Sequence, residues 1–229
     1  MKTAIYTAIC GNRATLIDPP IIHPDVDYIA YVDKPNLNCK VWEQREAISF
    51  SLDKKYGPRR NAKIYKILPN LYLNEYDLTM WVDGNLFCKM HPIDIYNQFL
   101  LPNQSNIGVL RHAKRTCAYD EAKRVRRRRD YPPLIDAQMD YYKKENFPAK
   151  HGLYHLAAII RKKSRETDLI NLRWWEQICK FSSRDQLSFS MVLWSLGIKP
   201  TILPGLIRYP DANNFVSYYE QVILSQRKK

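Results

Sequence analysis

Short runs of strand-forming residues alternate along this chain with longer segments of helical periodicity, and this alternation limits the fold more than any other feature. Strands are predicted at Thr3–Cys10, Asp27–Asp33, Asp77–Val82, Asn106–Leu110, Leu153–Ile160 and Thr201–Leu203. Helices are predicted at Glu43–Leu52, Arg60–Leu68, Pro92–Leu100, Cys117–Arg129, Leu134–Lys144, Glu166–Lys180 and Arg184–Leu196. Such alternation is typical of an α/β fold with a mostly parallel central sheet flanked by helices. Ligands of these sheets bind beyond the carboxyl ends of the strands.

No internal repeat, low-complexity tract or linker divides the 229 residues, so we predict a single domain over residues 1–229. Within it we expect a basic helical insertion at about 111–150 and a C-terminal tail at about 205–229. The longest apolar run is about five residues, far short of the roughly 20 that a membrane helix needs. The five cysteines are widely spaced without a C-x-x-C pair, which favours a reducing compartment over a disulfide framework or a zinc site.

The positive charge of the chain is concentrated in one segment. Of a net charge of +13, residues 111–129 carry nine Lys or Arg against two acidic residues. Such a cluster attracts a polyanion, which can be nucleic acid, an anionic membrane surface or a diphosphate ligand. A solvated basic helix face is the structural alternative. The segment shows no base-reading pattern, and the chain has no G-x-x-x-x-G-K, G-x-G-x-x-G, G-x-S-x-G or H-E-x-x-H motif.

The sequence Asp83-Gly84-Asn85 ends one apolar run and precedes another. Asp-Gly between apolar runs predicts a hairpin turn. The alternative is a carboxylate at the carboxyl end of a strand, where Asp83 and the Asn85 amide would offer oxygen ligands to Mg²⁺ or Mn²⁺. Gly84 would then let the backbone approach the ligand closely.

Two further segments combine a structural and a chemical interpretation. Ser183 and Gln186 have the spacing of a capping box, which leaves Asp185 available as a general base at a helix N-terminus. Arg60 and Lys63 lie at the start of a helix, where cations oppose the helix dipole unless an anionic ligand is close.

The strings "YTAICG", "YIAYVDK", "RRNAKIYKILPNLYLNEYDLTMWVDGN", "RHAKRTCAYDEAKRV" and "RDQLSFSMVLW" occur in this order over roughly the first two hundred residues. In order and spacing they resemble a family of small GT-A-type glycosyltransferases. Its members include surface-glycan and capsular transferases of bacteria, a domain of large algal viruses and plant mucilage-related proteins. The resemblance implies a single GT-A-like, Rossmann-like domain.

The resemblance also implies a set of site residues. Those expected to bind the nucleotide-diphosphate sugar are Thr7, Ala8, Gly11, Asp33, Arg60, Lys63, Asp83, Gly84 and Asn85. Asp83 and Asn85 stand where GT-A enzymes place the D-x-D motif for Mn²⁺ or Mg²⁺, with Asn85 in place of the second acid. Asp185 matches the catalytic base of inverting members. Arg111, His112 and Gln186 would line the sugar or acceptor pocket.

We therefore predict a hexosyltransferase-like enzyme of polysaccharide biosynthesis, which transfers a sugar to a hydroxyl of a surface, capsular or lipid-linked glycan. We expect it in the cytoplasm, in peripheral contact with the inner face of an anionic membrane through its basic cluster. Two alternatives stay open. One is a nucleic-acid-binding module that uses residues 111–129, and the other is an inactive sugar-nucleotide binder.

Overall fold

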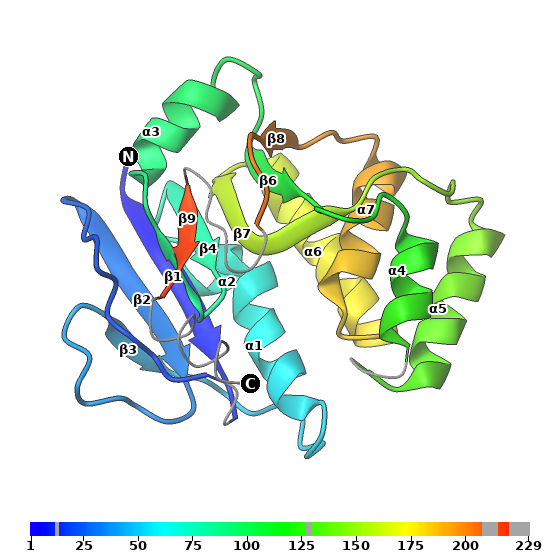
Figure 1. Cartoon of the computed structure of the whole chain (residues 1–229), viewed down its shortest axis with the longest axis horizontal. Helices are drawn as coiled ribbons and strands as arrows, with labels where there is room; N and C mark the ends of the chain where they lie inside the picture. The colour runs from blue at the N-terminus through cyan, green and yellow to red at the C-terminus, as the bar shows by residue number, and fades with distance from the viewer. Residues whose placement is uncertain (12–13, 127–129, 208–214, 220–229) are drawn as a thin grey trace.

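A computed structural model of the chain describes residues 1–11, 14–126, 130–207 and 215–219. Its core is a seven-stranded sheet in the order β3–β2–β1–β4–β7–β6–β8, and a two-stranded sheet pairs β5 with β9 (Figure 1). The strands are β1 Thr3–Ile9, β2 Val26–Val32, β3 Glu43–Glu46, β4 Leu78–Val82, β5 Leu86–Cys88, β6 Ile107–Arg111, β7 Tyr154–Lys162, β8 Thr201–Leu203 and β9 Val216–Tyr218. In the large sheet only β7 is antiparallel to its neighbours, so the predicted α/β fold with a mostly parallel sheet is confirmed.

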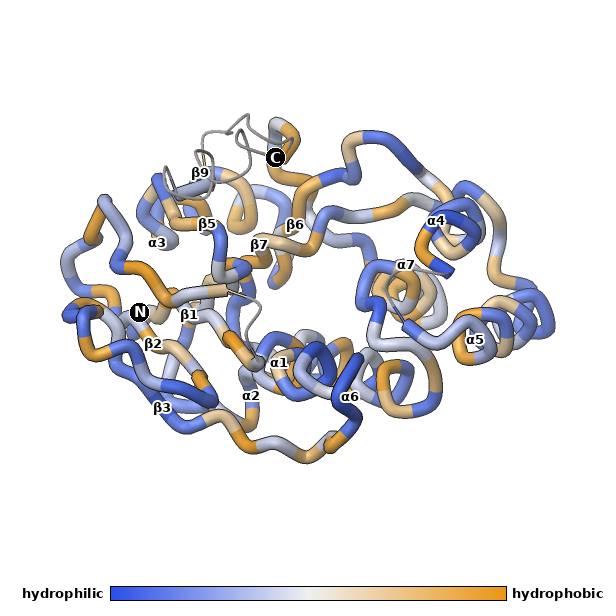
Figure 2. Tube along the Cα trace, turned by 60° about the horizontal axis from the view of Figure 1, so that its bottom comes forward, coloured by the Kyte–Doolittle hydropathy of each residue, from blue (hydrophilic) through white to orange (hydrophobic). Residues whose placement is uncertain are grey.

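Helices cover both faces of the large sheet. They are α1 Gly57–Ile67, α2 Pro69–Tyr72, α3 Pro92–Ile95, the π-helical turn η1 Tyr96–Leu100, α4 Ala118–Val125, α5 Pro132–Lys144, α6 Arg165–Lys180 and α7 Asp185–Leu196. Figure 2 shows α1 beside α6, and residues of both helices belong to one buried apolar cluster with β1 and β4. No helix in the described part of the chain is long and apolar enough to cross a membrane.

The central strand β1 shows how the two faces are filled. Every residue of its sequence TAIYTAI is buried, as expected for a strand covered on both sides. Ala4 and Tyr6 face the cluster that includes α1, α6 and α7. Ile5 and Ile9 face the opposite cluster, which includes α3, η1 and β9. Alternation along one strand therefore fixes which helices lie on which side.

Helices α4 and α5 form a smaller hydrophobic cluster with the start of α7. They lie at the end of the molecule opposite β3 (Figure 1). This part contains the described portion of the predicted basic insertion, whereas Arg127–Arg129 fall outside the described residues. Of the predicted tail at 205–229, the structure describes 205–207 and 215–219, so the domain boundaries stay a prediction.

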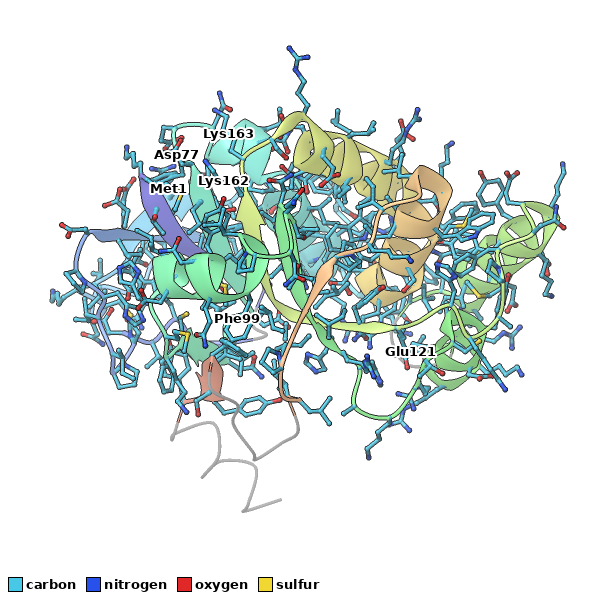
Figure 3. The ribbon with its side chains drawn as sticks, turned by 90° about the horizontal axis from the view of Figure 1, so that it is seen from above. Met1, Asp77, Phe99, Glu121, Lys162 and Lys163 are labelled. Carbon is cyan, nitrogen blue, oxygen red and sulfur yellow. The ribbon has the colours of Figure 1, made fainter. Side chains whose placement is uncertain are left out.

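At the amino ends of the parallel strands, the side chains of Met1, Asp77, Lys162 and Lys163 lie together (Figure 3). There the Lys2 backbone N–H donates to Asp77 Oδ2 at 2.9 Å, which ties the start of β1 to the start of β4. Ligands of such sheets bind at the opposite end, where β1, β2 and β4 finish.

The helix predicted at Glu43–Leu52 is wrong. Residues 43–46 form β3, which pairs in parallel with β2 at the edge of the sheet, and residues 47–52 form neither helix nor strand. The ladder with β2 outweighs the local helical preference of Glu, Gln and Arg. Charged side chains are common on an edge strand because they discourage pairing with other chains.

The predicted capping box of Ser183 and Gln186 is also wrong. Helix α7 begins after Arg184 and has no side-chain cap. The Ser183 backbone N–H instead donates to Asp130 Oδ2 at 2.5 Å. A capping box is present at α6, where Ser164 and Thr167 exchange hydrogen bonds with each other's backbone. The buried carboxylate of Asp130 therefore fixes the entry to α7.

Candidate active site

A cavity of about 340 Å³ lies at the carboxyl end of β4, bordered by the second half of α1 and the start of α7. Its volume falls in the usual range for small-molecule sites. Most of its exposed lining is polar, with five charged side chains. The lining residues are Lys63, Lys66, Asp83, Asn85, Leu86, His112, His155, Leu156, Ala157, Arg184, Asp185, Gln186 and Tyr218.

Asp83 is held in a turn directly after β4. Its backbone N–H donates to the Ala157 carbonyl at 2.8 Å, and its carbonyl accepts from the Leu86 N–H at 2.8 Å. The predicted turn is confirmed, but the hairpin is not, because β5 pairs with β9 rather than with β4. The turn carries the chain out of the large sheet and leaves the Asp83 carboxylate at the cavity.

The Asp83 carboxylate already has two donors. Oδ1 accepts from the Trp81 indole N–H at 2.8 Å and lies 3.5 Å from Lys66 Nζ. Burial raises the pKa of this carboxyl, but the nearby Lys66 and Lys63 ammonium groups outweigh it and hold the pKa below its usual value. With 41% of its side chain exposed, Asp83 remains the most accessible carboxylate of the cluster.

Asp185 is the first residue of α7 and is only 3% exposed. Its Oδ2 accepts from Lys63 Nζ and from Lys66 Nζ, each at 2.6 Å. Burial opposes ionisation, yet these two ammonium groups and Arg184 hold the pKa of Asp185 far below its usual value. The carboxylate is therefore ionised and shared between two lysines.

The two lysines lie one helical turn apart on α1, at i and i+3, so their side chains share one face of the helix. Burial lowers the pKa of Lys63 to about 8, and the neighbouring Lys66 adds to that effect. Lys66 is 2% exposed, and its Nζ lies 5.4 Å from the centroid of the Trp81 ring. Its carboxylate partners offset its burial and hold its pKa above the usual value. A cation this deeply buried needs such partners.

Two histidines border the same cavity, with ring centroids 6.3 Å apart. His112 Nδ1 accepts from the backbone N–H groups of Lys114 at 3.1 Å and Arg115 at 3.0 Å. These bonds place the proton of the neutral ring on Nε2. Burial lowers the pKa of His112 to about 4. His155 also has a lowered pKa because of burial, and its Nδ1 has no partner among the described residues.

A buried carboxylate fixes the wall beside α7. Glu121 is 1% exposed and accepts from Arg115 Nε at 2.6 Å and from an Arg184 guanidinium nitrogen at 2.8 Å. Arg184 also donates to Gln186 Oε1. The Gln186 amide in turn donates to the Tyr154 carbonyl at 3.0 Å. Figure 3 labels Glu121 on α4, which shows that a helix outside the sheet supports this wall.

The structure brings six of the predicted site residues together at the cavity: Lys63, Asp83, Asn85, His112, Asp185 and Gln186. Sequence reasoning missed Lys66, His155, Arg184 and Tyr218. Lys66 had a signal, since it lies three residues after Lys63 in a predicted helix. Tyr218 had none, because its position depends on pairing between distant strands.

Arg60 does not line the cavity. Its guanidinium donates to the carbonyls of Ile178 at 2.7 Å and Phe181 at 2.6 Å. These carbonyls belong to the C-terminal end of α6, which attracts a cation through its unpaired oxygens and dipole. Arg111, at the exposed end of β6, is likewise outside the lining.

The residues predicted near β1 also lie outside this cavity. Thr7 and Ala8 are buried within the strand, 1% and 8% exposed. The Gly11 N–H donates to Asp33 Oδ2 at 2.5 Å, which joins the ends of β1 and β2. Gly11 has a φ of +69°, a conformation that favours glycine. Gly84 is packed against Ile9, so its missing side chain gives room to the core rather than to the cavity.

The residues present do not fit the Mn²⁺ or Mg²⁺ ion predicted at Asp83 and Asn85. Such ions take several oxygen ligands, with at least one or two carboxylates free to bind. Here the Asp83 and Asp185 carboxylates are both engaged by lysines. Within residues 1–11, 14–126, 130–207 and 215–219, no group of three or more His, Cys, Asp or Glu could hold a metal ion.

A mostly parallel sheet with a charged cavity at the carboxyl end of a central strand is the arrangement in which α/β domains bind their ligands. Residues 49–220 match the TOD1/MUCI70 glycosyltransferase-like domain. The chain belongs to this family, and the predicted resemblance to GT-A-like glycosyltransferases is thereby confirmed. Every residue that lines the cavity lies within the matched range, whereas Thr7, Ala8, Gly11 and Asp33 precede it.

The chain is similar to a protein of Arabidopsis thaliana described as "Probable hexosyltransferase MUCI70", with 28% identity over 188 residues. This match covers 78% of the chain and 32% of the plant protein, so the chain spans about a third of its relative's length. Among solved structures, apo mouse xyloside xylosyltransferase 1 aligns with a TM-score of 0.47 and 8% identity. That alignment covers 88% of this chain and 84% of the mouse chain.

Proposed function

We propose that this chain is a hexosyltransferase-like enzyme that transfers a sugar from a nucleotide-diphosphate donor to an acceptor hydroxyl. The observation that carries the proposal is the cluster of Lys63, Lys66, Asp83 and Asp185 in a cavity of ligand size, inside the range matched by the glycosyltransferase-like family. A buried group of paired cations and carboxylates in a cleft is characteristic of a functional site.

The reaction has two requirements that this cluster can meet. The acceptor oxygen bonds to the anomeric carbon of the sugar while the bond from that carbon to the diphosphate breaks, and the bonding electrons leave with the diphosphate. The growing charge of that leaving group needs positive partners in a site shielded from water. Lys63 and Lys66, both on the cavity wall, are the nearest candidates.

The second requirement is a base for the acceptor proton. Asp185 remains our candidate, with inversion at the anomeric carbon as the expected outcome. A carboxylate held by two ammonium groups is a weak base, because the best catalytic pKa lies near the working pH. The role therefore requires that the bound donor draws Lys63, the more exposed of the two lysines, toward its phosphates, which would weaken the hold on Asp185 and raise its pKa.

A thermal-shift panel tests the proposal, because a ligand that binds only the folded chain raises its apparent stability. We expect stabilisation by UDP or GDP species and none by oligonucleotides. The reverse result would favour the nucleic-acid-binding alternative. With the sugar nucleotide so identified, Asp185→Asn is expected to abolish transfer while nucleotide binding persists. Near-normal turnover of this variant would exclude Asp185 as the base. If the wild type binds the sugar nucleotide but transfers no sugar to any of a panel of glycan acceptors, that result would favour the inactive binder.

We also propose that the acceptor is a surface, capsular or lipid-linked glycan, and that the enzyme works in the cytoplasm at the inner face of a membrane. The support is the basic segment 111–129, whose described part includes the exposed Lys123 of α4. Retention on liposomes that contain anionic lipid at physiological salt is the measurement. A chain that stays in solution would contradict the membrane contact without affecting sugar transfer.

A further inference from the structure

We propose that the ammonium groups of Lys63 and Lys66 bind the donor diphosphate in place of a divalent cation, so that this domain binds its donor and transfers sugar without a metal ion. The inference rests on the proposed function and specifies how the same site holds its substrate.

The first argument is the arrangement of charge. Lys63 Nζ and Lys66 Nζ both lie 2.6 Å from one oxygen, Asp185 Oδ2. Two ammonium groups that share a single carboxylate oxygen repel each other, and a second anion nearby would relieve that repulsion. A diphosphate supplies several such oxygens. The lysines are thus already placed for an anion with more than one charged oxygen.

The second argument is the balance of charge over the whole cavity. Its lining includes Lys63, Lys66 and Arg184 against Asp83 and Asp185. Behind Arg184, the buried Glu121 is shared with Arg115, so the group as a whole keeps a net charge of +1. The start of α7, a helix of 12 residues, adds the positive end of its dipole at Asp185. The described lining therefore favours an anion before any cation is added. A cavity built to take up a divalent cation would carry an excess of carboxylates instead.

The third argument concerns the carboxylate that a metal would need. Asp83 Oδ1 accepts from the Trp81 indole and lies 3.5 Å from Lys66 Nζ. A divalent cation on this oxygen would meet the Lys66 ammonium at close range. Lys66 cannot easily move away, because its side chain is 2% exposed and is enclosed by Asp83, Asp185 and the Trp81 ring. Lys66 thus already supplies a positive charge beside Asp83, the residue that the resemblance assigns to the metal ion.

Accessibility differs between the two lysines. The Lys63 side chain is 19% exposed, whereas Lys66 is almost fully enclosed. We therefore assign the direct contact with the outer phosphate oxygens to Lys63. Lys66 adds its positive charge from the buried side of the cavity and holds Asp83 and Asp185 in place through its ion pairs.

The test is titration calorimetry of the whole chain with UDP, GDP, ADP and CDP, first in EDTA and then with about 1 mM Mn²⁺ or Mg²⁺. We expect the Kd of the nucleotide that binds to agree within about twofold between the two conditions. A loss of tenfold or more in EDTA, restored by metal, would overturn the inference and leave the proposed function intact. If none of the four nucleotides binds in either condition, the proposed function fails with it.

Variants give an independent measurement in EDTA. Lys63→Met should weaken diphosphate binding by roughly tenfold or more, because a lost charge-assisted hydrogen bond costs about 1.5–3 kcal/mol and 1.4 kcal/mol is tenfold. Lys143→Met is the matched control, since Lys143 is 66% exposed on α5, where its ammonium lies 3.1 Å from Asp140 of the same helix. Equal affinity of Lys63→Met and wild type would overturn the inference.

Discussion

Replacing Lys66 by Met should destabilise the fold, and the same replacement should cost little more in a chain that already carries Asp185→Asn. The four charges of Lys63, Lys66, Asp83 and Asp185 sum to zero. Removing Lys66 leaves one uncompensated negative charge in a buried cluster, which typically costs about 3–5 kcal/mol. We expect about 3 kcal/mol, the lower end, because Lys63 still bonds to Asp185 Oδ2 at 2.6 Å.

The exposure of the partners decides which pair carries this energy. Lys66 and Asp185 are 2% and 4% exposed at the side chain, so their attraction is little screened. Asp83 is 41% exposed and lies 3.5 Å away, so its pair with Lys66 is expected to contribute little. Asp185→Asn alone should also cost about 3 kcal/mol, since it leaves two lysines against one partly exposed carboxylate.

Urea denaturation of the wild type, both single variants and the double variant measures the coupling. Lys63 and Asp83 remain in the double variant and keep the cluster neutral, so its loss should be close to that of one single variant. The expected coupling energy is about 2–3 kcal/mol, at the upper end for contacting residues. If the two single losses add to within about 0.5 kcal/mol, the residues do not act as one cluster, and the reasoning is refuted.

Two further predictions concern the turn and the pH dependence. Gly84→Ala should lower the free energy of unfolding by about 1–3 kcal/mol, because the added Cβ would lie 2.9 Å from Cδ1 and Cγ1 of Ile9. Thermal unfolding measures this loss. In a Gly84→Ala chain, the additional change Ile9→Val should recover part of the lost stability. An unchanged Tm of Gly84→Ala would show that the turn shifts without cost, and it would contradict this prediction. Burial lowers the pKa of His112 to about 4. Between about pH 6.5 and pH 4 the unfolded chain therefore binds a proton at this residue that the folded chain does not bind. His112 thus makes the free energy of unfolding decrease as the pH falls, by up to about 1.4 kcal/mol per pH unit. His112→Asn should make that decline shallower in urea titrations at several pH values, and an identical slope would contradict the burial argument.

Much of the sheet was predictable from sequence because its strands are apolar and bounded by turn residues. β1 and β4 have uninterrupted buried runs, and their predicted ranges agree with the structure to within one residue at each end. β3 was not predictable, since its sequence EQRE has no apolar residue. Its conformation comes from the ladder with β2, in which Ile29 pairs with Glu43. An edge strand of this kind is determined by its neighbour, and no local pattern reveals it.

The site was predictable where a charged residue follows a strand or opens a helix. Asp83 and Asp185 both satisfy that description, and both line the cavity. The destination of a long cationic side chain was not predictable. Arg60 and Lys63 are three residues apart on α1, yet Arg60 reaches the end of α6 and Lys63 reaches Asp185. Which anion or carbonyl lies within reach depends on how α1 packs against α6 and α7, and that packing is set by the whole core.

The pairing of β5 with β9 has a consequence for the order in which the molecule can assemble. Leu86 pairs with Tyr218, and Cys88 with Val216, so one wall of the cavity joins segments that are far apart in the chain. Contacts of such long sequence separation form slowly, after local helices and neighbouring strands. Lys66 and Asp185, 119 positions apart, impose the same condition. A refolding chain should therefore recover its helical signal well before it can bind a nucleotide, so that ligand binding reports on completed folding rather than on secondary structure.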